Sequence, residues 1–155
     1  MIIYTVSNSF LNTLFARGSY DATIPTSSQC WIGMSTTVPK IDDNSESSTY
    51  GKIINFTEPA SSTGYRRSRL GIQGNDVTYI MDAAKNGSIT NGKNFIFFDE
   101  ATVGGGGFGE LKWFGLFSGS SDGAPVLAGE LTTPVTVPAG NVLIFRPNNL
   151  TVSME

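Results

Sequence analysis

Acidic and amide side chains cluster in one polar stretch of the sequence, residues 40–50, which contains Asp42, Asp43, Asn44 and Glu46. Carboxylate and amide oxygens in a loop are the ligands that calcium prefers in proteins. The EF-hand pattern, however, requires ligands at alternate positions, a central glycine and a distant glutamate, and this stretch does not match it. We therefore predict a solvated acidic loop without a metal, and calcium binding is the alternative.

Arginines cluster once, in the segment 65–72, whose sequence YRRSRLGI is typical of a strand. In a strand, Tyr65, Arg67 and Arg69 would share one face, and Arg66 would point to the other. Two guanidinium groups beside a phenol can hold a carboxylate, a phosphate or a sugar. Tyr65, Arg67 and Arg69 are therefore candidate interface residues, and ion pairing within the chain is the alternative.

A run of glycines contains a literal G-x-G-x-x-G pattern at Gly104, Gly106 and Gly109. The dinucleotide-binding pattern needs a strand before the glycines and a helix after them, so that the helix N-terminus holds the pyrophosphate. Here the strand-like segment 111–117 follows the glycines, and no lysine with serine or threonine completes a P-loop. We predict a loop tip, and we expect no bound cofactor.

Residue types that carry catalysis are scarce in this chain. It has no histidine, which excludes Ser-His-Asp and Cys-His catalysis, and its single cysteine, Cys30, cannot form an internal disulfide. Asp99 and Glu100 are adjacent, so in a strand they would point to opposite sides, whereas a glycosidase needs two carboxyl groups that face each other. We predict no catalytic residue and no enzymatic activity.

The two tryptophans are candidates for sugar binding. Trp31 and Trp113 lie in strand-like segments, where aromatic side chains usually belong to the core but can also form a platform for a sugar. A tryptophan exposed beside a groove would favour a carbohydrate-binding module, and burial of both would favour the core.

Composition excludes further classes of function. The 155 residues correspond to one ordinary domain, and a net charge of −3 with a pI near 4.9 argues against a general nucleic-acid binder. No apolar run approaches the roughly 20 residues of a membrane span, so we expect neither nucleic acid nor membrane as a partner. Charged residues make up only 15 % of the chain, and the resulting neutral polar surface suits β-rich assemblies.

One helix is expected, over about residues 7–17. Phe10, Leu11, Leu14 and Phe15 fall on one face of it, and Gly18 provides a stop after Arg17. A helix of about ten residues is not stable alone in water, so its apolar face must pack on the sheet or on a neighbouring subunit. Phe10, Leu14 and Phe15 are therefore candidate interface residues.

The rest of the chain has the period-two pattern of strands. Cys30, Ile32 and Met34 alternate with their neighbours, and Asn-Gly pairs at 86–87 and 91–92 signal turns. Further strands are expected at 65–72, 77–81, 94–98, 111–117, 126–131, 135–137, 142–145 and 150–154. Many short strands with regular turns predict a single all-β domain over 1–155, an antiparallel β-sandwich of Greek-key or jelly-roll type.

The order of several motifs along the chain resembles that of a known family. The first motif joins Glu58, Pro59, Gly64, Tyr65 and Arg67. The second consists of Phe98, Glu100, Ala101, Thr102, Phe114, Gly115 and Phe117, and the third of Leu131, Thr133, Pro134, Thr136, Val137, Ala139 and Gly140. In these motifs the chain resembles small virion proteins of tailed bacteriophages that are often labelled tail fibre proteins. It departs from them where glycines replace a Trp-Gly pair and where Asn141 replaces an aspartate.

This resemblance implies a structural role in the virion, in the tail or fibre or on the head, without catalysis or cofactor. Its partners would be other virion proteins (capsid, tail or fibre) and further copies of the chain in a homo-oligomer. We expect the helix face and the loops 40–50 and 104–109 to make these contacts. The alternative is a carbohydrate-binding module that recognises a glycan of the host surface.

Overall fold

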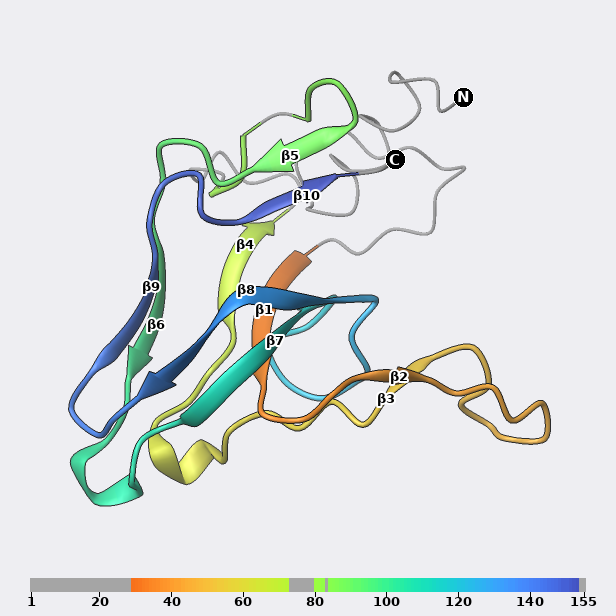
Figure 1. Cartoon of the computed structure of the whole chain (residues 1–155), viewed down its shortest axis with the longest axis horizontal. Coiled ribbons are helices and arrows are strands. Elements are labelled where there is room, and N and C mark those ends of the chain that lie inside the picture. The colour runs from red at the N-terminus through yellow and green to blue at the C-terminus, as the bar shows by residue number, and fades with distance from the viewer. Residues whose placement is uncertain (1–28, 73–79, 83, 154–155) are drawn as a thin grey trace. The chain divides into compact units, whose positions relative to one another are not determined.

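A computed structural model describes residues 29–72, 80–82 and 84–153 of the chain (Figure 1). The helix expected at about 7–17, with Phe10, Leu14 and Phe15, lies outside these residues. The described part consists of β-strands and two short 3-10 helices, η1 (Ser61–Thr63) and η2 (Val103–Gly105). The strands are β1 (Gln29–Ser35), β2 (Lys40–Ile41), β3 (Ile53–Ile54), β4 (Ser68–Ile72), β5 (Ser88–Thr90), β6 (Ile96–Glu100), β7 (Gly109–Phe117), β8 (Leu127–Val137), β9 (Val142–Phe145) and β10 (Thr151–Ser153). The prediction of an antiparallel all-β protein is confirmed.

The chain divides into two compact units. Unit 1 contains residues up to 30, 69–97 and 144–155, and unit 2 contains residues 31–68 and 98–143. Strands β1, β4, β6 and β9 each run from one unit into the other along the chain. The single domain and the two-layer sandwich therefore stay predictions.

The largest sheet has the strand order β4-β1-β7-β8. Strand β7 lies inside this sheet and pairs with β1 through Ile32↔Leu116 and Gly33↔Gly115. On its other side lies β8, one continuous strand where two short ones were expected (Figure 1). Pro134 lies within β8 because an edge strand tolerates a residue that donates no hydrogen bond.

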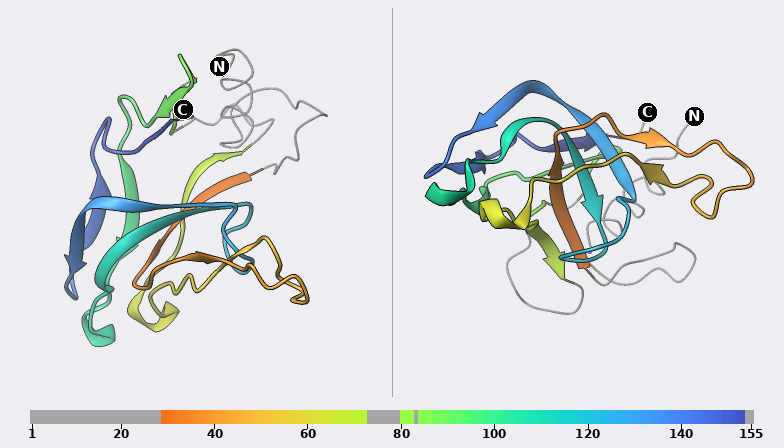
Figure 2. Two further views of the ribbon diagram at one scale, coloured as in Figure 1. Left: turned by 45° about the vertical axis from the view of Figure 1, so that its right-hand side comes forward. Right: turned by 90° about the horizontal axis from the view of Figure 1, so that it is seen from below.

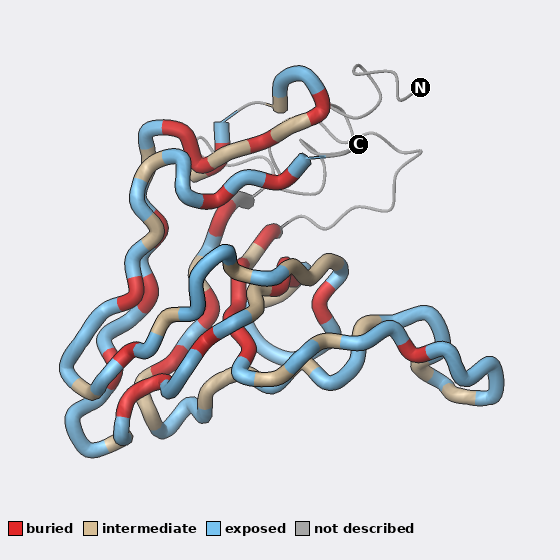
Figure 3. The backbone as a smooth tube through the Cα atoms, viewed as in Figure 1, coloured by how far each residue is buried: buried red, intermediate tan, exposed pale blue. Residues whose placement is uncertain are grey.

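The core of unit 2 forms around β1 and β7. Ile32 and Met34 are fully buried, in agreement with the predicted alternation, and Leu111 and Leu116 of β7 are also fully buried (Figure 3). Phe98, Phe108 and Phe117 add buried aromatic rings. Burying one such side chain contributes roughly 1.5–3 kcal/mol, so this region has an apolar core of its own.

Unit 1 contains the paired strands β5 and β10. The buried Asn91 joins its own turn to residues 146–150, because its Nδ2 donates to the carbonyls of Asn94 and Arg146 and its Oδ1 accepts from the Leu150 N–H. The predicted turn at Asn86-Gly87 is confirmed, with φ of 53° and 73°. The strand expected at 77–81 is wrong in its described part, since residues 80–81 form a bend.

Residues 36–57 form an extended hairpin, here called the arm, which projects from the β1-β7-β8 part of unit 2 (Figure 2). Strands β2 and β3 pair within it through Lys40↔Ile54 and Ile41↔Ile53. The prediction of a loop over 40–50 is therefore wrong at its first residues. The pairing is short, and its β3 half lies beyond the polar stretch, so no local alternation revealed it.

Candidate functional site

In unit 2, hydrogen bonds join the half-buried Glu58 to the buried Tyr65 and Arg67, and we call these three residues the Glu58 cluster. The Nε of Arg67 donates to Oε1 and Oε2 of Glu58 at 3.0 and 3.1 Å, and Nη2 donates to Oε2 at 2.7 Å. The hydroxyl of Tyr65 donates to Oε1 of Glu58 at 3.0 Å. The Arg67 side chain is only 5 % exposed and that of Glu58 is 23 % exposed, so each charge is held by its partner in place of water.

Arg67 also fixes the loop of residues 118–123. Its Nη1 donates to the carbonyls of Gly119 and Asp122 at 3.0 and 2.8 Å. Its guanidinium carbon lies 3.4 Å from the centroid of the Phe117 ring, in a cation–π contact. One side chain therefore connects the segment before β4 to the end of β7 and to the loop that follows it.

Tyr65 connects the Glu58 cluster to the sheet. Its hydroxyl accepts from the backbone N–H of Met34 at 2.6 Å, and its ring packs on Phe98 and Phe108 at centroid distances of 6.1 and 5.4 Å. Burial, followed by the charge of Glu58, raises the pKa of the Tyr65 hydroxyl. The hydroxyl therefore stays protonated and acts as a permanent hydrogen-bond donor to Glu58.

Two glycines make room for these contacts. A Cβ at Gly33 would lie 2.5 Å from Oε1 of Glu58 and 2.8 Å from Phe117 Cε2. Gly64 has φ of 84°, which favours glycine, and a Cβ there would lie 2.6 Å from the carbonyl of Glu100. The motif of Glu58, Gly64, Tyr65 and Arg67 thus builds a structural cluster inside the protein.

Arg66 and Arg67 pair within the chain, which was the alternative to an interface. Arg67 pairs with Glu58, and Arg66 lies 3.6 Å from Asp99 in an exposed pair. Tyr65 and Arg67 are buried, whereas Arg69 is exposed. The three residues therefore do not share one face, because β4 begins only at Ser68 and strand alternation does not extend back to Tyr65. Their role in an interface stays a prediction.

A groove of about 500 Å³ opens beside the Glu58 cluster. Its lining residues all belong to unit 2: Trp31, Glu58, Pro59, Ser61, Tyr65, Arg66, Arg67, Ser120, Ser121 and Asp122. Trp31 and Trp113 are both half-buried, but of the two only Trp31 lines this groove. We did not predict from the sequence that Glu58 binds Tyr65 and Arg67, or that residues 120–122 line the groove. The spacing of Glu58, Tyr65 and Arg67 was the available signal for Glu58.

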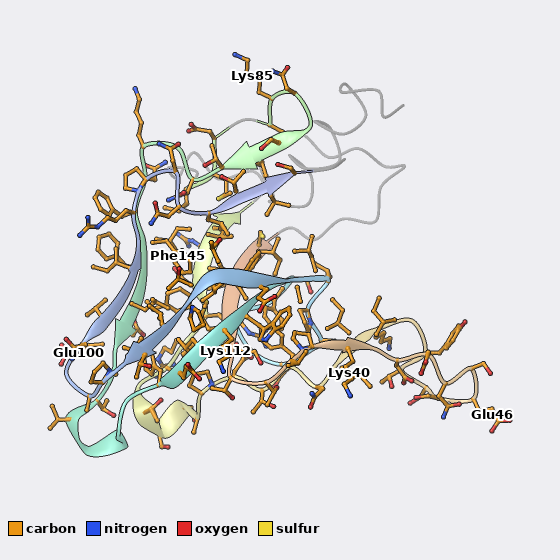
Figure 4. All side chains as sticks on the ribbon, viewed as in Figure 1. Lys40, Glu46, Lys85, Glu100, Lys112 and Phe145 are labelled. Atoms are coloured by element: carbon orange, nitrogen blue, oxygen red, sulfur yellow. The ribbon has the colours of Figure 1, made fainter. Side chains whose placement is uncertain are left out.

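The arm, unlike the Glu58 cluster, consists mostly of exposed residues. All residues from 36 to 57 are described, and among them Asp42 alone is buried (Figure 3). Apolar side chains are exposed along it: Val38 by 52 %, Ile41 by 70 %, Tyr50 by 59 % and Ile54 by 37 %. Lys40 and Glu46 extend from the arm into solvent, Glu46 near its tip (Figure 4). The arm therefore presents apolar and charged groups with no core beneath them.

Asp42 holds the tip of the arm in shape. Its carboxylate accepts from the Asn44 N–H at 3.1 Å and from the Thr49 hydroxyl at 2.5 Å. Hydrogen bonds from Ser47, Thr49 and Asn44 hold its pKa below the ordinary range. In the described part of the chain, no group of three or more acidic or cysteine side chains is placed to hold a metal ion.

The glycine run lies in the short connection between β6 and β7. Residues Val103–Gly105 form η2, and β7 follows, so no helix N-terminus faces the pattern. A Cβ at Gly107, whose φ is 84°, would lie 2.4 Å from the carbonyl of Val137. The glycines permit this close approach of backbone to backbone, which supports the interpretation as a loop rather than a phosphate site.

Comparisons with known proteins identify the family. A family model described as podophage GP4 fiber I protein gp80 matches residues 2–153. A search of curated proteins finds no match. Among the described residues, no helix is long and apolar enough to cross a membrane. The expected resemblance to phage tail fibre proteins is thus confirmed over nearly the whole chain: this protein belongs to the podophage GP4 fiber I protein gp80 family, a family of phage fibre proteins of the virion.

Proposed function

We propose that this chain is a non-enzymatic structural subunit of a phage fibre that assembles through protein–protein contacts, and that the arm is one of its main contact surfaces. Membership of a phage fibre family supports a structural role in contact with other virion components. The observation that carries the proposal is the exposure of Val38, Ile41 and Tyr50 on a hairpin on which no apolar side chain is fully buried.

Exposed apolar groups on such a hairpin favour association. Single exposed apolar residues are common on protein surfaces, but these lie along one projecting element with only Asp42 buried. A two-stranded hairpin is marginally stable by itself. Burial against a partner would stabilise the arm and remove its apolar groups from water.

The proposal also covers the arrangement of the strands and the assembly of the subunits. We expect the strands to form a β-sandwich in one domain over 1–155, and the subunits to form a symmetric homo-oligomer. Tyr65, Arg67 and Arg69, with Phe10, Leu14 and Phe15, are the further candidate interface residues. A neutral polar surface supports dense packing of identical subunits, because many like charges would repel one another.

Light scattering on the purified chain tests the assembly proposal. Val38→Ser removes an apolar group from the arm, and Val126→Ser removes the same group at a similar exposure, 57 %, outside the arm. We expect the wild type and Val126→Ser to form the same oligomer, and Val38→Ser combined with Ile41→Ser to dissociate already at concentrations at which the wild type stays assembled. A wild-type chain that stays monomeric and binds no other virion protein would contradict the proposal.

The second candidate function is recognition of a host-surface glycan. The specific observation in its favour is that half-buried Trp31 lines a groove. A glycan array tests this function with the wild type and the Trp31→Ala and Trp113→Ala variants. Saturable binding lost only in Trp31→Ala would support it, and binding to no glycan would exclude it.

A further inference from the structure

We infer that the groove beside the Glu58 cluster is a preformed site for a neutral sugar, which contacts Trp31 on one wall and Asp122 and Arg66 at the rim. This inference rests on the second candidate function, glycan recognition. It goes beyond that function by naming the site and the chemical class of the ligand.

The groove has the size and composition of a small-ligand site. Its volume of about 500 Å³ lies within the roughly 300–1,000 Å³ common for such sites. Trp31 and Pro59 give it an apolar lining, and Ser61, Ser120 and Ser121 add hydroxyl groups. A pyranose ring has the matching surface, because its C–H groups can pack on an indole while its hydroxyls meet polar groups around the rim.

The charges in the groove favour a neutral ligand. Arg66 and Arg67 are matched in number by Glu58 and Asp122, so the lining carries no net charge. Arg67 and Glu58 are already engaged with each other. The rim therefore offers one guanidinium donor and one carboxylate acceptor, and these opposite charges give no net attraction for an anionic or a cationic ligand.

Arg66 is available at this rim. Its side chain is 81 % exposed, and its pair with Asp99 at 3.6 Å is exposed on both sides. Such a surface pair contributes little stability, so the guanidinium can turn to a sugar hydroxyl at little energetic disadvantage. Asp122 is exposed, and its contact with Arg67 uses the backbone carbonyl.

The part of the lining formed by residues 120–122 is held in place before any ligand binds. Arg67 fixes the loop 118–123 through the carbonyls of Gly119 and Asp122. Asp122 and Gly123 have φ of 56° and 73° and so form a tight bend there. A wall that is already ordered reduces the entropic cost of binding. Arg67 is therefore a positioning residue, whereas Trp31, Arg66 and Asp122 would contact the sugar.

A titration that follows tryptophan fluorescence tests the site. Trp113→Phe leaves Trp31 as the single reporter, and Trp31→Phe leaves Trp113, which does not line the groove. The probes are the methyl glycosides of glucose, galactose, mannose and N-acetylglucosamine, with glucuronic acid and N-acetylneuraminic acid as acidic counterparts. We expect a saturable change in Trp113→Phe with at least one neutral glycoside, no change with the acids, and no change in Trp31→Phe.

Asp122→Asn provides a variant whose folding is not in question, since the Asp122 carbonyl that contacts Arg67 is retained. In the Trp113→Phe background it should weaken binding about tenfold, in line with the loss of one charge-assisted hydrogen bond. A matched control is Asp43→Asn, which changes an exposed aspartate on the arm and should leave binding unchanged.

The outcomes separate this site from the broader function. Glycan-array binding that persists in Asp122→Asn, or that is confined to acidic glycans, would overturn the neutral-sugar site while the glycan-recognition function stands. Binding to no glycan on the array and no saturable fluorescence change would overturn both. The assembly proposal depends on neither result.

Discussion

The Glu58 cluster and the arm are both rich in polar residues, but they differ in which side chains are shielded from water. In the Glu58 cluster, a half-buried carboxylate binds a buried guanidinium and a buried phenol. On the arm, apolar side chains such as Ile41 and Tyr50 are exposed, and Asp42 is the one buried residue of the described range 36–57. The first region is complete within the chain, and the second leaves apolar surface in water.

This contrast separates residues that maintain the fold from residues available for function. A buried ion pair whose groups are hydrogen-bonded strongly penalises loss of one partner. An exposed apolar side chain contributes little to the isolated fold but can stabilise an interface when a partner covers it. Changes in the Glu58 cluster should therefore reduce stability, and changes on the arm should reduce assembly.

The largest expected effect follows the loss of Arg67. Arg67→Ala leaves the carboxylate of Glu58 without its cation and frees the loop 118–123, and it should lower the free energy of unfolding by about 3–5 kcal/mol. Chemical denaturation measures this change. Arg66→Ala is the matched control and should change stability by less than about 0.5 kcal/mol, because Arg66 is exposed. Equal effects of the two variants would contradict the account.

A smaller loss is expected at Gly33. The Cβ of Gly33→Ala would approach the Glu58 carboxylate and the Phe117 ring, and such overpacking lowers stability by about 1–3 kcal/mol. Gly104→Ala is the control, because a Cβ at that position would meet no atom within 4 Å. Thermal unfolding should separate the two variants, and a Gly33→Ala protein as stable as the wild type would show that Glu58 is not closely packed.

Asp42 should make the arm sensitive to acid. Folding lowers the pKa of this carboxyl, so its stabilisation is fully present above the unfolded pKa of about 3.9 and is lost as pH falls through the folded pKa. An NMR titration should place the Asp42 midpoint below about 3.9. Protection of the Asn44 amide from hydrogen exchange, taken relative to its intrinsic rate at each pH, should fall as the carboxyl becomes protonated, and Asp42→Asn should remove this dependence. A midpoint above about 3.9 would contradict the role of the hydrogen bonds.

The smallest effect on stability is expected on the arm itself. Val38→Ser and Val126→Ser should each change the free energy of unfolding of the isolated chain by less than about 0.5 kcal/mol, because both side chains are exposed. Only the arm variant should weaken association. A marked loss of stability in Val38→Ser would show that the arm packs within the chain.

Local patterns in the sequence predicted the strands better than the contacts between them. Strand β9 has the predicted bounds 142–145, and the Asn86-Gly87 turn followed from residues that tolerate positive φ. The pairing of β2 with β3 did not follow, because it joins the first residues of the polar stretch 40–50 to residues beyond its end. Side-chain partners far apart in sequence, such as Arg67 and Gly119, depend on the folded loops.

For the candidate site too, contacts between residues far apart in the sequence could not be predicted. Sequence spacing indicated that Tyr65 and Arg67 act together, and both do contact Glu58. It placed Arg69 with them because a strand was assumed to begin at Tyr65, whereas β4 begins at Ser68. The groove could not be predicted, since its walls come from residues 31, 58–67 and 120–122, which meet only in the folded chain.

Photocrosslinking in the assembled particle tests the central claim most directly. Benzoylphenylalanine in place of the exposed Tyr50 probes the arm, and the same group in place of the exposed Val126 probes a surface outside it. The account predicts efficient crosslinks from position 50 to a second copy of the chain or to another virion protein, and few from position 126. An arm that forms no crosslinks in the intact particle would contradict the claim that this chain assembles through its arm.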